Sequence, residues 1–200
     1  MLRPTKPPTL RGQQTRRHLL AGAEQVFSER GFERASISEI TRRAGVAVGS
    51  FYVYFPTKHA IFVELIEHLG RALRKRVFDK TLGLSDRLAI ERAGMLAFLE
   101  FVAEHRGMYR IMRQAEFVDE GVFRRYYQSI ADAYAHGLTD AMGKGQVSKG
   151  DAEVMAWSMM GVLDFLGMRF VLWSETDDLE RVVDAAMKFV GRGLERRAAS

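Results

Sequence analysis

The sequence predicts an all-α protein of about nine helices, and three observations support this fold class. Apolar residues recur at helical spacing along most of the chain, no segment alternates persuasively like a strand, and glycines or capping residues separate the helical stretches. The chain has 200 residues, of which 47% are hydrophobic and 28% are charged. This composition is typical of a globular protein with a substantial core.

The first third of the chain predicts a short arm, three helices and the start of a fourth. Residues 1–12 contain three of the four prolines and are expected to be a disordered basic arm. The apolar stripe of the first helix ends near Gly31. Ser36 and Glu39 form a capping box for a second helix that ends at Gly45. Residues 47–55 predict a third helix, and Thr57 is a suitable N-cap for a longer helix over 58–78.

The rest of the chain predicts five further helices, over residues 86–105, 108–115, 120–142, 149–173 and 177–197. The apolar run 154–173 is long enough to cross a bilayer. However, Asp164 and Arg169 lie within it, and each would cost about 2.5–3.5 kcal/mol in a central membrane position. We therefore expect this helix to be buried between a core and a partner subunit, with no membrane involved.

The charge distribution points to a polyanionic partner. Residues 1–60 contain ten Lys and Arg against four Glu, a net charge of +6, whereas residues 61–200 contain 20 basic against 21 acidic residues, a net charge of −1. A basic segment attached to a neutral body is typical of nucleic-acid binding, although a solvated basic face would look the same. The chain has no cysteine, which excludes disulfides, thiolate metal sites and cysteine nucleophiles.

Residues 36–55 predict two short helices joined by a tight turn, which is a helix-turn-helix unless it is an ordinary helical hairpin. The stretch 27–62 contains a series of motifs in fixed register: Phe27, Gly31-Phe32, Ser36-Ile37-Ser38-Glu39-Ile40, Ala44-Gly45-Val46, Gly49-Ser50-Phe51-Tyr52, Tyr54-Phe55 and Lys58. With these motifs it resembles the DNA-binding domain of the TetR/AcrR family of bacterial transcriptional regulators. The resemblance implies a DNA-binding domain over 13–60 and a ligand-binding and dimerisation domain over 61–200.

The resemblance also implies which residues meet DNA. Phe51 and Phe55 anchor the third helix inward, and the hydroxyls of Tyr52 and Tyr54 and the ammonium of Lys58 are expected at phosphates. The full set of expected DNA-binding residues is Ser36, Ser38, Arg42, Val48, Gly49, Ser50, Tyr52, Val53, Tyr54 and Lys58. Arg43 is an alternative to Arg42, and core packing is the alternative for the two tyrosines.

Two features of the third helix depart from the family pattern. Ala47 stands where a polar N-cap is often found, so this helix should depend on packing rather than capping. The helix also has no Arg, Lys, Gln or Asn, which excludes bidentate reading of purines. Specificity is therefore expected from Ser50, from the methyl groups of Val48 and Val53, and from DNA shape.

The resemblance implies that residues 149–173 and 177–197 pair with their symmetry mates in a homodimer, so that the operator is nearly palindromic. It also implies a small-molecule effector, usually one that releases a repressor from DNA. The expected pocket residues are Phe101, Tyr109, Met112, Arg113, Phe117, Phe123, Tyr127, Met160 and Phe165. Ordinary core packing is the alternative for these aromatic and Met residues.

Five arginines surround the same region: Arg106, Arg110, Arg113, Arg124 and Arg125. They suggest an anionic effector such as an acyl-CoA, or simply a solvated face. An all-helical enzyme is the competing class, but the five histidines form no zinc or di-iron motif and no nucleophile elbow is present. We expect no enzyme, cofactor or metal, and a cytoplasmic location because no apolar signal segment follows the basic start. A ligand-independent architectural DNA-binding protein is the third alternative.

Overall fold

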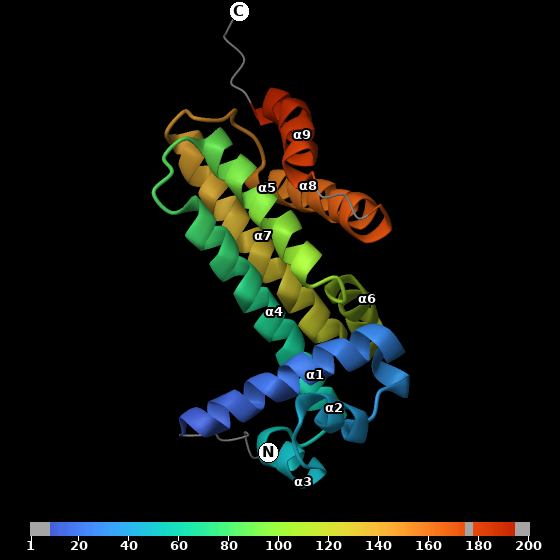
Figure 1. Cartoon of the computed structure of the whole chain (residues 1–200). Coiled ribbons are helices and arrows are strands. Elements are labelled where there is room, and N and C mark those ends of the chain that lie inside the picture. Colours follow the sequence, from blue (N-terminus) through green and yellow to red (C-terminus); the bar gives the residue numbers. More distant parts are fainter. Residues whose placement is uncertain (1–8, 175–177, 195–200) are drawn as a thin grey trace, which may run out of the picture. The chain divides into compact units, whose positions relative to one another are not determined.

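The computed structural model describes residues 9–174 and 178–194, and every regular element in these ranges is helical (Figure 1). This confirms the all-α fold class. The elements are α1 (Leu10–Arg34), α2 (Ile37–Ala44), α3 (Val48–Tyr54), α4 (Lys58–Thr81), α5 (Arg87–Glu104), α6 (Met108–Val118), α7 (Glu120–Gly143), α8 (Ala152–Leu166), the π-helix η1 (Gly167–Trp173) and α9 (Leu179–Leu194).

The helices form two compact units. The first unit contains the chain up to Gly70 together with Gly107–Tyr126, and the second contains Arg71–Arg106 and the chain from Tyr127 onward. The sequence division at residue 60 is therefore not the division of the packing, because α6 and the start of α7 pack with the N-terminal helices. The boundary at residue 60 between a DNA-binding domain and a ligand-binding domain stays a prediction about function.

The first helix begins earlier than the sequence suggested, and its last turn follows a kink at Gly31. The Oγ1 atom of Thr9 accepts a hydrogen bond from the Gly12 amide at 3.1 Å, so the helix begins at Leu10. Residues 10–12 were expected in a disordered arm and are helical instead, while residues 1–8 lie outside the described residues. At the other end, Gly31 has φ of 79° and ψ of 163°, so the regular helix stops at this kink, as the sequence suggested, and one further turn runs to Arg34.

The next two helices form the predicted helix-turn-helix. The Oγ atom of Ser36 accepts a hydrogen bond from the Glu39 amide at 3.1 Å, and Gly45 ends α2 in the left-handed conformation at φ 67°. Ala47 gives α3 no side-chain cap, as expected. Packing holds this seven-residue helix instead, since Phe51 and Phe55 are both buried.

The core of the first unit brings α1, α2 and α4 together. The rings of Phe27 and Phe62 meet edge to face at 5.1 Å between centroids, and both side chains are fully buried. α1 also crosses α2 closely: a Cβ atom at Gly22 would lie 2.8 Å from the carbonyl oxygen of Ile40. This crossing fixes α2, and the turn at Gly45 then fixes α3.

The core of the second unit contains a buried polar cluster. Arg87 of α5 donates to the Glu91 carboxylate through Nε at 2.8 Å and through Nη2, and the hydroxyl of Tyr134 in α7 donates to the same carboxylate. Arg87 and Glu91 are both buried. Burial, followed by the Glu91 charge, raises the pKa of Tyr134 far above its ordinary value. The three side chains therefore satisfy one another inside an otherwise apolar core.

Candidate nucleic-acid interface

The surface of α3 is set by its two anchors. With Phe51 fully buried, Val48, Tyr52 and Val53 are 45%, 58% and 68% exposed. Of the other expected contacts on this helix, Gly49 is exposed, whereas Ser50 and Tyr54 are half-buried. With its side chains an α-helix is about 10–12 Å in diameter, so α3 can enter a major groove about 12 Å wide.

The start of α2 carries the two expected serines, and both are exposed. Ser36 uses its oxygen as the cap acceptor for the Glu39 amide, which leaves its hydroxyl proton free to donate. Ser38 lies in the first turn of α2, where exposed backbone amides and the helix dipole favour a phosphate.

Adjacent arginines in the last turn of α2 have different environments. Arg43 forms a bidentate ion pair with Glu29 of α1, whereas Arg42 is largely exposed and its Nη2 atom lies 3.8 Å from the Glu39 carboxylate. The side-chain hydrogen bonds between Arg43 and Glu29 lower the pKa of Glu29 and raise the pKa of Arg43. Arg42 is therefore the arginine that can turn toward a phosphate without breaking a strong pair.

Lys58 is engaged by the end of α1, and its expected contact with a phosphate stays a prediction. Its ammonium donates to the carbonyl oxygens of Phe32, Glu33 and Ala35 at 2.7, 3.1 and 3.1 Å, and it lies 4.6 Å from the centre of the Phe32 ring. All three ammonium protons are used by these carbonyls. A phosphate at the start of α4 would have to displace one of them, because the side chain lies along the end of α1.

The residues expected around an effector fall into three groups by exposure. Phe101, Tyr109 and Met112 are buried, Phe123, Tyr127 and Met160 are half-buried, and Arg113, Phe117 and Phe165 are exposed. In the single chain, Phe117 and Phe165 are surface side chains, at 87% and 67% exposure. The nine residues also divide between the two units, with positions 109, 112, 113, 117 and 123 in the first.

Sequence reasoning missed one aromatic contact in the second unit. The rings of Tyr127 in α7 and Trp157 in α8 stack with 6.4 Å between centroids, and Trp157 is partly exposed. Both residues lie in helices predicted from the sequence, but the pairing depends on how α7 and α8 pack. No pattern along either helix could have indicated it.

The helices expected at a dimer interface expose an apolar face. On α8, Val154, Trp157, Gly161 and Phe165 are exposed at helical spacing, and on α9 the exposed residues include Ala185, Phe189 and Gly193. A Cβ atom at Gly161 or Gly193 would meet nothing within 4 Å. The segment Ala152–Trp173 is also long and apolar enough to cross a membrane by length and composition alone.

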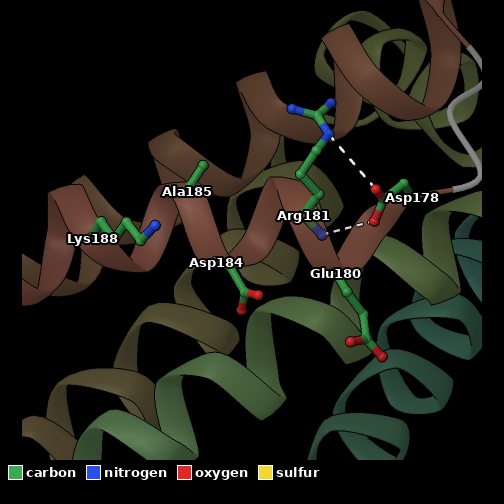
Figure 2. A pocket seen from close by; sticks show the side chains of 6 residues that line it. All are labelled: Asp178, Glu180, Arg181, Asp184, Ala185 and Lys188. Carbon is green, nitrogen blue, oxygen red and sulfur yellow. Dashed lines mark hydrogen bonds and ion pairs between the residues drawn. The ribbon is translucent and has the colours of Figure 1, made fainter.

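A concavity of about 580 Å³ lies at the start of α9. Figure 2 shows the side chains that line it. Its lining is charged, and Arg181 faces Asp178, with a 3.0 Å hydrogen bond from the Arg181 amide to the carboxylate. None of the expected effector residues lines it. Among the described residues, no group of three or more His, Asp or Glu side chains is placed to hold a metal ion.

Comparison with known protein families identifies the N-terminal helices. Residues 19–65 match the family model described as bacterial regulatory proteins, tetR family. The uncharacterized HTH-type transcriptional regulator YdgC of Bacillus subtilis is 30% identical over 165 residues, which cover 81% of this chain and 84% of that protein. The HTH-type transcriptional regulator TtgR of Pseudomonas putida is 29% identical over 211 residues, covering 98% of this chain and 95% of TtgR.

Solved structures share the fold along most of the chain. The fatty acid degradation regulator FadR from Bacillus halodurans superposes with a TM-score of 0.79 at 18% identity, over 88% of this chain and 93% of that one. A TetR family transcription regulator from Marinobacter aquaeolei has the same TM-score at 14% identity, over 94% and 98% of the two chains. At these identities the likeness concerns the fold alone.

Proposed function

This chain belongs to the TetR family of bacterial transcriptional regulators, and from that premise we propose that it is a repressor that binds a near-palindromic operator as a homodimer and leaves it when a small-molecule effector binds. It would act in the cytoplasm. Regulators of this family bind DNA and typically act as dimers, so the proposal concerns the direction of control, the interface and the effector.

The exposed face of α3 is the observation that carries the DNA-binding part. Phe51 and Phe55 point inward, which leaves Val48, Tyr52 and Val53 for the floor and walls of a major groove. Ser36, Ser38 and Arg42 of α2 supply hydroxyl and guanidinium groups for the flanking phosphates. This division suits a helix without purine-reading side chains, because the phosphate contacts give affinity and DNA shape gives selectivity.

The exposed apolar face of α8 and α9 supports the homodimer. A monomer that left Trp157, Phe165 and Phe189 in water would forfeit the free energy of burying them, about 1.5–3 kcal/mol for a side chain such as Phe. A symmetry-related copy covers such a face with the same face. The glycines at 161 and 193 leave room for the partner's side chains.

The test is binding of the purified protein to labelled DNA from upstream of its own gene, by fluorescence anisotropy at low ionic strength, with shuffled DNA as the control. Sedimentation of the free protein gives its oligomeric state in the same buffer. We expect a dimer with affinity for its own upstream DNA at least about 10³-fold above that for shuffled DNA. A monomer without this preference would overturn the proposal, and partitioning into lipid vesicles would assign the apolar face to a membrane instead.

For the effector we propose an elongated apolar molecule with an anionic end, such as an acyl-CoA. The fatty acid degradation regulator named above shares this fold, and exposed arginines accompany the aromatic residues of α6 and α7. Isothermal titration with acyl-CoAs of increasing chain length, followed by their effect on DNA binding, tests this class. Absence of both heat and DNA release along the whole series would exclude it.

A further inference from the structure

The peptide unit at Phe32 is held from two helices that are far apart in the sequence. The Phe32 amide donates to Oε1 of Gln114, which lies in the second turn of α6. The Phe32 carbonyl accepts from the Lys58 ammonium at 2.7 Å, at the first residue of α4. One residue at the kink of α1 therefore connects α6 to the beginning of the helix that follows α3.

The kink leaves the Phe32 amide in need of a partner. Gly31 breaks the regular α-helical backbone just before Phe32, so that the helix ladder is interrupted there. The Gln114 side chain supplies an acceptor from outside α1 and is itself held in place, since its Nε2 donates to the Arg110 carbonyl at 2.7 Å. Gln114 therefore presents a fixed acceptor rather than a freely rotating one.

Other contacts show that α6 lies close along the end of α1. Arg110 donates through Nη1 to the Ser28 carbonyl at 3.2 Å, and a Cβ atom at Gly107 would lie 2.4 Å from the Cβ atom of Ser28. Beyond the end of α6, the Oδ2 atom of Asp119 lies 3.1 Å from Nε2 of His59, in the first turn of α4. α6 thus reaches the start of α4 both directly and through Phe32.

We infer that Gln114 is a positioning residue for the DNA-binding helices: by holding the Phe32 amide, it fixes the carbonyls on which Lys58 anchors the first turn of α4. The inference rests on the proposed function, in which α3 meets DNA. Since only residues 55–57 separate α3 from α4, displacement of α4's first turn displaces α3. A shift of α6 would in this way alter the operator-binding surface without Gln114 touching DNA.

Hydrogen exchange of the free protein tests this step without DNA. The Ala60 amide, which donates to Thr57 Oγ1 at 3.0 Å, and the Ile61 amide, which donates to the Thr57 carbonyl, report on the first turn of α4. Gln114→Leu should make both exchange about fivefold faster, as expected for the loss of one net hydrogen bond. Gln114→Glu keeps an acceptor for Phe32 but loses the donor to the Arg110 carbonyl, so it should restore only part of the protection.

The matched control is Arg110→Ala, which removes a different α6–α1 hydrogen bond and leaves Phe32 held. It should not accelerate exchange at Ala60 and Ile61. Equal acceleration in Arg110→Ala, or none in Gln114→Leu, would overturn the inference.

The wild-type protein gives an independent measurement if Gln114→Leu does not fold. The Phe32 amide should be protected at least about tenfold relative to an unstructured peptide, because Gln114 holds it. Unprotected exchange at Phe32 would also overturn the inference. All of these measurements use the free protein. Failure to bind DNA would therefore refute the proposed function, but not the inference that Gln114 positions the first turn of α4.

Discussion

Arg43 and Glu29 join α2 to α1 through two parallel hydrogen bonds, Nη1 to Oε1 at 2.8 Å and Nη2 to Oε2 at 2.5 Å. This bidentate geometry is the strong form of an arginine–carboxylate pair. It occupies the guanidinium of Arg43, whereas the neighbouring Arg42 keeps its guanidinium exposed. Adjacent residues of the same type therefore have different expected roles, one structural and one at the DNA backbone.

Arg42→Ala is expected to weaken operator binding and to reduce the slope of log K against log salt by about one, because one phosphate contact is lost. Arg43→Ala should leave that slope nearly unchanged and lower the melting temperature of the first unit. Anisotropy titrations at four salt concentrations, together with thermal melts, separate the two effects. Equal slopes for wild type and Arg42→Ala would remove Arg42 from the interface.

The same ion pair predicts a pH dependence of stability. Hydrogen bonding to Arg43 lowers the pKa of Glu29 in the folded protein from its ordinary value of 4.5. A depressed carboxylate pKa stabilises the fold above the unfolded value, and this contribution is lost as pH falls through the folded pKa. Thermal melts between pH 7 and pH 3 should therefore decline less steeply below about pH 4.5 in Glu29→Gln than in wild type. Parallel curves would show that the pair contributes nothing to stability.

Substitution of Lys58 should mainly lower the stability of the fold, whereas substitution of Tyr52 should mainly weaken DNA binding. Lys58→Met removes three hydrogen bonds from an ammonium to carbonyls, so it should lower the free energy of unfolding by about 2 kcal/mol and change the salt slope by less than one. Tyr52→Phe removes an exposed hydroxyl, so it should weaken DNA binding by about two- to tenfold and leave stability unchanged. A full unit of salt slope lost in Lys58→Met would restore the phosphate contact expected from the sequence.

Two exposed phenylalanines, one inside and one outside the proposed dimer interface, allow a test of where that interface lies. Phe189 of α9 is 76% exposed and Phe78 of α4 is 62% exposed, but only Phe189 lies in the proposed interface. Phe189→Glu should produce monomers in sedimentation velocity, because a symmetric interface would bury the new charge twice. Phe78→Glu should remain a dimer. The reverse result would move the interface to the end of α4.

The buried cluster of the second unit should be sensitive to the loss of one partner. Arg87→Met leaves the Glu91 carboxylate buried without its cation and should cost about 3–5 kcal/mol in urea unfolding. Arg92→Met removes an exposed ion pair with Asp184, at 2.8 Å, and should cost far less, because solvent screens such a pair. A similar loss of unfolding free energy in both variants would show that burial does not make the Arg87–Glu91 pair more important for stability than the exposed pair.

The sequence by itself determined the helices and the DNA-reading motif, because these depend on interactions between residues close in the chain. Ser36 caps α2, Gly45 ends it, and the four-residue spacing of Phe51 and Phe55 orients α3. Each of these signals needs only helical periodicity and local hydrogen bonds.

Only the tertiary structure decided which polar side chains form hydrogen bonds within the chain and so are less available to DNA or a ligand. The sequence gives Lys58 a position suited to a phosphate, but the carbonyls that take its protons come from residues 32–35, more than 20 positions earlier. The same holds for Gln114, whose acceptor meets an amide 82 residues away, and for Arg43, whose carboxylate partner lies on another helix. Such pairings depend on how helices cross, and helix crossing leaves no periodic signal in the chain.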